Sequence, residues 1–251
     1  MKLAHISWKD SEVYFKNNDT VLIATGSTEC HGSHTALGTD TLVPDRLIEL
    51  IEDKVNVLIA PTVPYGACDS LTEFSGTISL SDDGFYDVIN RIVNGFKKHG
   101  AKKFIFLNGH GGNVGMLKRI CLELDDENCI GTIINWWLLA GKLNPKWKGG
   151  HGGAQETSAV MAINEKFVDL SKVVELSFKD LSETLPQNGF YDVLFEGQEM
   201  MIPRKVSTIT KDGWIGNDHP KNATVEWGKE MLDETALFIT NFIETFRVIE
   251  I

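Results

Sequence analysis

The sequence predicts an α/β fold: a single layered domain with a mostly parallel central sheet and helices on both faces. Short apolar runs typical of buried strands alternate with longer amphipathic stretches typical of helices, from residue 20 to about residue 165. The 251 residues contain no internal repeat and no low-complexity linker, so we assign residues 1–251 to one domain. The crossovers between parallel strands are expected to be right-handed.

Four apolar runs are predicted to be buried strands of this sheet. DTVLIATGS ends in a Gly-Ser pair at residues 26–27, and VNVLIAPTVPYG runs from residue 55 into a loop. The third run, AKKFIFLNGHGGN, ends in a glycine turn, and CIGTIINWW at residues 129–137 is the fourth. Because helices are expected on both faces of the sheet, these strands should be covered on both sides.

Helices are predicted between and after these strands. Apolar side chains recur at helical intervals in DTLVPDRLIELIEDK (residues 40–54). DDGFYDVINRIVNGFKKHG has acids early, bases late and Gly100 as its stop, and VGMLKRICLEL follows the third strand. The amphipathic segment 223–246 is expected to pack on the sheet as the last helix. The stretch 168–225 is less regular.

Composition restricts the classes of partner. The formal net charge is −11, and an acidic surface repels phosphate backbones, so nucleic acid is not an expected partner. No apolar run reaches membrane-spanning length, and the start MKLAHISWKD lacks the apolar region of a signal peptide. The four cysteines form no spaced disulfide framework. We therefore expect a cytoplasmic protein with no membrane partner.

Carboxylates and histidines crowd the stretch GSTECHGSHTALGTDT at residues 26–41. Glu29 and His31 are two positions apart after a buried strand, so in extended backbone they project to the same side. Glycines let the chain turn back and bring Asp40, whose two oxygens can bridge two cations. Like charges repel unless a cation offsets them, which explains the crowding. Cys30 would point away, and we interpret it as a packed thiol.

Two further clusters are expected to join the first. NGHGGN ends the third strand, and ligands collect at the carboxyl ends of parallel strands, so His110 becomes a further ligand candidate. HGGAQETS places His151 in a glycine loop and Glu156 at the start of the next helix, and either can act as acid or base. A phosphate-binding turn is the rival interpretation of NGHGGN, but it contains no Lys or Arg. Such ligands suit Zn²⁺, Mn²⁺ or Fe²⁺.

These motifs, in this order, resemble the creatininase (creatinine amidohydrolase) family. The matching segments are GSTECHG, GTD, NGHGGN and HGGAQETS, and GWIGNDHPKNATVEWGKE is similar to the family's glycine-rich stretch before its last helix. The likeness spans roughly residues 20–235. It implies an α/β fold with two divalent metal ions and a small-molecule substrate. It also implies hydrolysis of carbon–nitrogen bonds in cyclic amides, formamides or peptides, and a homo-oligomer, often a hexamer.

The resemblance also implies roles for individual residues. Glu29, Asp40 and His110 match the ligands of one metal, and His31 with the bridging Asp40 matches those of the other. His151 matches a histidine beside the substrate that carries protons, so it is the catalytic candidate.

Two positions depart from creatininase itself. Where this chain has Gly112, creatininase has a glutamate that serves as a ligand, so Glu156 is our candidate to replace it, with a general base as the alternative role. Where this chain has Gly111, creatininase has an aromatic residue that touches substrate, and its loss argues against creatinine. NGHGGN is more similar to the deformylase, peptidase and sugar-lactone or ketone hydrolase branches.

Candidates for contact with the substrate are Tyr65, Asp69, Gly111 and Trp137. Tyr65 and Asp69 lie on the loop after the second strand, at the same edge of the sheet as the clusters. A core or interface role is the alternative for Trp137. His34 either orients a ligand or bonds to the backbone of its loop.

The predicted reaction uses a hydroxide that bridges two metal ions. Two such ions can lower the pKa of water from 15.7 to roughly 7, and Glu156 or His151 would give a proton to the leaving nitrogen. The alternatives are hydrolysis of a carbocyclic ketone or lactone of the inosose type, a metal-dependent phosphoesterase, and a non-catalytic metal- or sugar-binding module. A phosphoesterase would need Arg or Lys to hold phosphate, and the motif loops have none.

Overall fold

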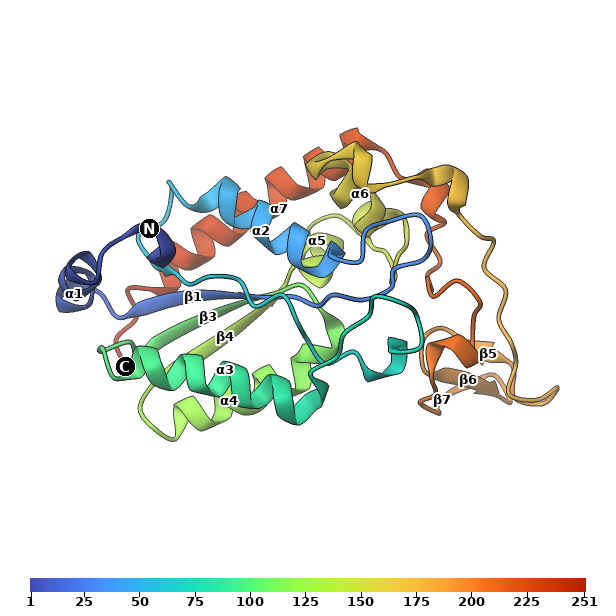
Figure 1. Ribbon diagram of the computed structural model, residues 1–251, viewed down its shortest axis with the longest axis horizontal. Helices are drawn as coiled ribbons and strands as arrows, with labels where there is room; N and C mark the ends of the chain where they lie inside the picture. Colours follow the sequence, from blue (N-terminus) through green and yellow to red (C-terminus); the bar gives the residue numbers. More distant parts are fainter.

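A four-stranded parallel sheet forms the centre of the computed structural model, which describes residues 1–251 (Figure 1). The strands lie in the order β2-β1-β3-β4. Their bounds are Thr20–Thr25 for β1, Leu58–Ile59 for β2, Lys103–Asn108 for β3 and Ile130–Asn135 for β4. The predicted fold class, α/β with a mostly parallel sheet, is confirmed.

Helices cover both faces of this sheet (Figure 1). One face carries α2 (Thr39–Ile51), α5 (Trp136–Leu143), α6 (Ala154–Ile163) and α7 (Val225–Phe246), and the other carries α3 (Ser81–Lys97) and α4 (Val114–Asp125). An additional helix, α1 (Trp8–Asn17), precedes β1 and was not predicted. It begins with a capping box between Ser7 and Asp10, which is a local sequence signal for the start of a helix.

Two predicted strands differ from the observed ones at their ends. The second apolar run forms a continuous strand of only two residues, because Pro61 lacks the amide hydrogen with which a strand continues its ladder, and pairing with β1 resumes only as a single bridge at Val63. The fourth strand ends at Asn135, and the two tryptophans that follow it begin α5 instead.

Each strand contributes to two separate hydrophobic cores because successive side chains point to opposite faces. Leu22 and Ala24 of β1 pack in the core beneath α2, α5 and α7, whereas Val21 and Ile23 pack in the core beneath α3 and α4. All four are fully buried. Burial of one such Leu, Ile or Val side chain contributes roughly 1.5–3 kcal/mol, so the sheet is a rigid base for the loops at its edge.

The strand order determines where a ligand can bind. The chain leaves β1 toward β2 on one side, while β3 lies on the other side of β1. The loops that leave the carboxyl ends of β1 and β3 therefore run in opposite directions, which leaves a crevice between them. In open parallel sheets ligands bind in the crevice at this point.

A small antiparallel sheet lies beyond the carboxyl ends of the main strands (Figure 1). It comprises β5 (Gln187–Asn188), β6 (Asp192–Phe195) and β7 (Gln198–Met201), all within the stretch that showed no regular pattern. A minor core joins this region to the loop after β1, and Cys30 is buried in it as predicted for a packed thiol.

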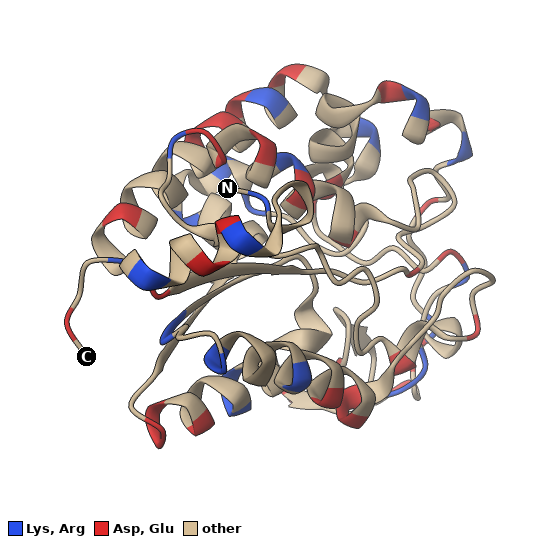
Figure 2. Cartoon of the chain, turned by 60° about the vertical axis from the view of Figure 1, so that its left-hand side comes forward, with Lys and Arg blue, Asp and Glu red and all other residues tan.

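Charged residues are concentrated on the helices and outer loops, and the parallel sheet is nearly free of them (Figure 2). None of the helices is long and apolar enough to cross a membrane.

Candidate metal centre

Four predicted ligands meet at the carboxyl ends of β1 and β3. Glu29 and His31 lie on the loop that follows β1, Asp40 lies in the first turn of α2, and His110 follows β3 by two residues. All four side chains are buried. The parallel register between Thr25 and Asn108 places the two loops side by side, which is why residues 70 positions apart can converge.

The two oxygens of Asp40 face different histidines. Its Oδ2 is 3.0 Å from His110 Nδ1, which is also 3.1 Å from Glu29 Oε1. Its Oδ1 is 3.0 Å from His31 Nε2, which is also 3.6 Å from Glu156 Oε2. Glu29, Asp40 and His110 therefore form a first donor set, and His31, Asp40 and Glu156 form a second, with donor atoms within 4.8 Å of one another in each.

Backbone carbonyls orient the two histidines. His110 Nε2 lies 2.9 Å from the carbonyl oxygen of Ala67, and His31 Nδ1 lies 3.1 Å from that of Glu29. Because a carbonyl only accepts, each of these nitrogens carries hydrogen and donates it. The opposite nitrogen of each ring then faces the carboxylates, as it does in histidines that bind metals.

The donor sets fit a divalent cation. Glu29 Oε1 and Asp40 Oδ2 are buried and accept no hydrogen bond, although His110 Nδ1 lies close to both. Burying a carboxylate oxygen without a partner is costly, and a cation between these atoms would supply that partner. Carboxylate oxygens with imidazole nitrogens suit zinc, manganese or iron.

Protons take the place of cations when metal is absent. Burial opposes charge on His31, but the carboxylates of Asp40 and Glu156 outweigh it and raise the pKa of His31 to about 10. Burial likewise opposes charge on His110, and Glu29 and Asp40 raise its pKa well above the usual value. Both imidazoles must lose a proton before they bind a metal.

Metal binding is therefore expected to release protons and to strengthen as the pH rises. Since both histidine pKa values are raised in the metal-free protein, protons compete with the metal across the neutral range and less so in alkali. Calorimetric titration with zinc or manganese, in buffers of different ionisation enthalpy, measures the number of protons released. A count near zero with a pH-independent affinity would contradict the assignment of His31 and His110 as ligands.

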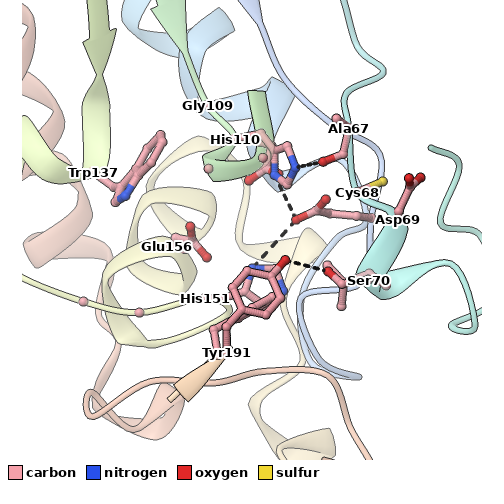
Figure 3. A pocket seen from close by; sticks show the side chains of 18 of the residues that line it. Ala67, Cys68, Asp69, Ser70, Gly109, His110, Trp137, His151, Glu156 and Tyr191 are labelled. Carbon is pink, nitrogen blue, oxygen red and sulfur yellow. Dashed lines mark hydrogen bonds and ion pairs between the residues drawn. The ribbon is translucent and has the colours of Figure 1, made fainter. Parts of the chain in front are cut away.

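His151 lies beside the two donor sets, and Glu156, a member of the second set, faces the same cavity (Figure 3). His151 Nε2 donates to the carbonyl oxygen of Cys30 at 2.7 Å, which leaves Nδ1 3.8 Å from Glu29 Oε1. Burial and the neighbouring charge of His31 lower the pKa of His151 to about 3, so its imidazole is neutral. Burial raises the pKa of Glu156 to about 7. His151 also forms a third possible donor set with Glu29 and His31.

A cavity of about 600 Å³ is lined by four of the five side chains of the donor sets, Glu29, Asp40, His110 and Glu156. Of the predicted substrate contacts, Asp69, Gly111 and Trp137 also line it (Figure 3). Tyr65 does not: the residue is 39% exposed, and the loop that carries it lines the cavity only from Ala67 onward. The structure thus does not bring Tyr65 to the site.

His34 supports the site from outside. Its buried ring places Nε2 3.1 Å from the hydroxyl of Thr157, the residue after Glu156. His34 therefore contacts α6 rather than any side chain of the donor sets.

Sequence reasoning missed two aromatic walls of the cavity. Phe190 and Tyr191 both line it, and both come from the stretch that showed no regular pattern. The ring of Phe190 meets that of His151 edge-on at 5.3 Å, and the hydroxyl of Tyr191 lies 3.1 Å from that of Ser70 (Figure 3). Two consecutive aromatic residues after a glycine were the only signal in the sequence.

Gly112 has no room for a side chain. A Cβ there would lie 2.0 Å from the carbonyl oxygen of Ala67 and 2.5 Å from His110 Nε2, whereas a Cβ at Gly111 would meet nothing nearer than Trp137 at 4.0 Å. A glutamate ligand could not occupy position 112 unless the loop at Ala67 moved. The carboxylates that lie within reach of His31 are those of Asp40 and Glu156.

The adjacent glycines provide a matched test of this packing. Gly112→Ala is expected to destabilise the metal-free protein by about 1–3 kcal/mol, because the new methyl group meets backbone that cannot give way. Gly111→Ala should change the free energy of unfolding by less than about 0.5 kcal/mol. Urea unfolding of both variants measures the difference, and equal effects would contradict the observed geometry.

The fold and the donor sets define a metal-binding hydrolase with an α/β architecture. A family model described as creatinine amidohydrolase matches residues 4–243. The chain belongs to the creatininase family.

Curated relatives share about a quarter to a third of their aligned residues with this chain. A creatinine amidohydrolase of Pseudomonas putida is 26% identical over 69% of this chain and 75% of its own length. A mycofactocin precursor peptide peptidase of Mycobacterium ulcerans is 29% identical over 66% of this chain and 67% of its own. A 3-dehydro-scyllo-inosose hydrolase of Thermotoga maritima is 28% identical over 61% of this chain and 53% of its own.

Solved structures show the same fold. A putative creatinine amidohydrolase of Bacteroides fragilis superposes with a TM-score of 0.79 at 22% identity, covering 100% of this chain and 98% of that one. A creatininase described as the Mn form gives a TM-score of 0.75 at 23% identity, covering 98% of both chains. A mutant creatininase described as Zn-Zn type gives 0.73 at 22% identity, again covering 98% of both.

Proposed function

We propose that this protein is a dinuclear metal-dependent amidohydrolase that cleaves a carbon–nitrogen bond in an uncharged small molecule. The substrate classes proposed are cyclic amides, formamides and peptide-like compounds. The observation that carries the proposal is that Asp40 joins two donor sets at the base of a cavity whose lining contains no Lys or Arg.

The first donor set would hold one divalent ion and the second would hold another. When bound, such ions supply a polarising charge for a substrate carbonyl and a bridging water of lowered pKa as the nucleophile. The Mn and Zn-Zn forms named among the structural neighbours support manganese or zinc, with iron retained as a third possibility by its ligand preference.

The residues around the donor sets hold them in position. Ser27 Oγ donates to Glu29 Oε2 at 2.9 Å, so the other oxygen, Oε1, is the one that faces His110. The carbonyl groups that accept from His31 and His110 fix both rings. Little rearrangement is then needed to bind the ions, which favours tight binding.

His151 is proposed to carry the proton. Its Nδ1 faces the donor sets while its Nε2 is held by the carbonyl of Cys30, so a neutral ring can accept a proton from the attacking water at Nδ1. The same atom can then return that proton to the leaving nitrogen. The ring of Phe190 packs nearly perpendicular to that of His151 beside this site.

His151→Asn is expected to lower kcat by about 10²–10⁴-fold while leaving the metal content unchanged, because it removes a proton carrier and no ligand. Metal analysis and steady-state kinetics of the same preparation test this. Loss of metal from the variant would make His151 a ligand, through its alternative set with Glu29 and His31.

The lining of the cavity bears on the substrate. Asp69 and Asp82 line it and no Lys or Arg does, so a phosphate or carboxylate group on the substrate would have no Lys or Arg partner there. This argues against the phosphoesterase alternative. The open cavity beside the donor sets also argues against a closed, non-catalytic metal site.

A hydrolase panel with zinc- or manganese-loaded protein tests the proposed function. The panel contains creatinine, N-formyl amines, short peptides, an inosose or lactone, and an aryl phosphate. We expect turnover of a C–N substrate and none of the phosphate. Turnover of the phosphate alone, or of nothing by fully loaded protein, would overturn the proposal.

A carbocyclic ketone or lactone is the second candidate substrate. The inosose hydrolase relative supports it, because the polarising charge that ions held by the two donor sets would supply suits a ketone as well as an amide. Faster turnover of the inosose than of every amide in the panel would identify the ketone or lactone as the substrate class.

The homo-oligomer stays a prediction. Leu138 is 50% exposed and Phe238 is 46% exposed, and both lie beside β4, whose outer edge is unpaired. This apolar surface supports self-association.

A further inference from the structure

The segment that carries His151 and Glu156 has no capping side chain at the N-cap of its helix. Four of its five first residues, 149–153, are glycines, and α6 then begins at Ala154. The N-cap of α6 is Gly153, which has no side chain to accept a hydrogen bond from the first turn. Helix starts without a cap leave backbone N–H groups unsatisfied, so a partner must come from elsewhere in the chain.

Asp218 supplies that partner from a loop more than 60 residues further along. Its Oδ1 accepts from the N–H of Gly150 at 2.8 Å, and its Oδ2 accepts from the N–H of Gln155 at 2.9 Å. Its backbone carbonyl accepts from the N–H of Ala154 at 3.0 Å. One residue thus holds the chain immediately before His151 and the helical turn that carries Glu156.

Glycines allow the carboxylate to approach this closely. A Cβ at Gly149, Gly153 or Gly216 would lie 2.4, 2.3 or 2.6 Å from an oxygen of Asp218. Gly149, Gly153 and Gly216 therefore surround one half-buried carboxylate–backbone contact. A negative charge at the N-terminus of α6 also interacts favourably with the helix dipole.

Two further contacts make the segment respond to Asp218 as a unit. Glu156 Oε2 accepts from the N–H of Gly152 at 2.7 Å, and Ile215, three residues before Asp218, donates its N–H to the carbonyl of His151 at 2.7 Å. A shift of the loop at Asp218 would therefore move both side chains together.

We propose that Asp218 is a positioning residue. It holds Glu156 of the second donor set and the proton carrier His151 in place, and it does not affect the position of the first donor set. The asymmetry follows from the chain, because Glu29, Asp40 and His110 all lie outside residues 149–156, whereas Glu156 and His151 lie within them. The role in proton transfer rests on the proposed function. The role in metal binding rests only on the second donor set holding an ion, and not on the hydrolytic activity.

The test compares Asp218→Ala and Asp218→Asn with Glu175→Ala. Glu175 is a matched control, because its exposed carboxylate pairs with His219 and Lys221 on the same loop and touches none of the cavity. Metal-free protein is titrated calorimetrically with zinc, and kcat, KM and the pH profile of kcat are measured on the loaded protein. Near-UV circular dichroism verifies that each variant is folded.

Asp218→Ala is expected to weaken zinc binding at the second donor set by about 10–100-fold and to leave zinc binding at the first donor set unchanged. It should lower kcat more than it raises KM, and it should shift the pH profile of kcat. Asp218→Asn should be intermediate, because an amide keeps one of the two acceptor oxygens. Glu175→Ala should match the wild type.

Equal weakening of both zinc events, or no change in either, would overturn the proposal. If the alanine variant does not fold, the asparagine variant carries the same comparison and the same criteria. Wild-type protein that binds two zinc ions yet hydrolyses nothing would refute the proposed function, while the unequal loss of zinc in the Asp218 variants would still support its positioning role.

Discussion

Asp40→Ala is expected to lose both metal ions and at least about 10³-fold in turnover. Asp40 is the only side chain that belongs to both donor sets, with one oxygen 3.0 Å from His110 and the other 3.0 Å from His31. Alanine leaves each set with two ligands. The fold should persist, since Asp40 is not part of either hydrophobic core.

Metal analysis after gel filtration and assay of the same sample measure the effect. Glu49→Ala on the same helix is the matched control, because its carboxylate is 54% exposed and pairs only with Arg46. An Asp40→Ala protein that kept both ions and its rate would show that the donor sets have been assigned incorrectly.

Glu156→Gln should lose the ion of the second donor set and retain that of the first. Its turnover should be lower by about 10²–10³-fold. Glutamine preserves the shape of the side chain but removes the charge with which the second donor set balances a cation. If Glu156 is instead the general base, both ions should remain while turnover falls by a similar factor. The ratio of metal to protein distinguishes the two roles.

Glu165→Gln serves as the control for this variant, since Glu165 is exposed just beyond the end of the same helix. Full activity together with full metal content in Glu156→Gln would exclude both roles for Glu156.

The architecture was predictable because periodicity reports burial directly. The runs around β1 and β3 are continuous apolar stretches, and the apolar residues of α2, α3, α4 and α7 recur at helical spacing. These patterns predict the parallel sheet and the helices that cover it. Where local chemistry competes with hydrophobicity, prediction failed: prolines shortened β2, and Trp136 began a helix where a strand was expected to continue.

The donor sets were predictable because their residues lie next to strand ends, where topology brings them together. Glu29, His31, Asp40 and His110 needed only the strand order to converge. The aromatic walls of the cavity and the residue that supports α6 were not predictable. Phe190, Tyr191 and Asp218 come from irregular segments whose place depends on tertiary packing. Tyr65 shows the opposite error, since proximity in sequence to the cavity loop does not decide which way a side chain points.

The measurement that tests the central claim most directly is anomalous diffraction from crystals grown with manganese. Two peaks are predicted, one among the donor atoms of Glu29, Asp40 and His110 and one among those of His31, Asp40 and Glu156, each in contact with a different oxygen of Asp40. A single peak, or peaks that Asp40 does not join, would contradict the account.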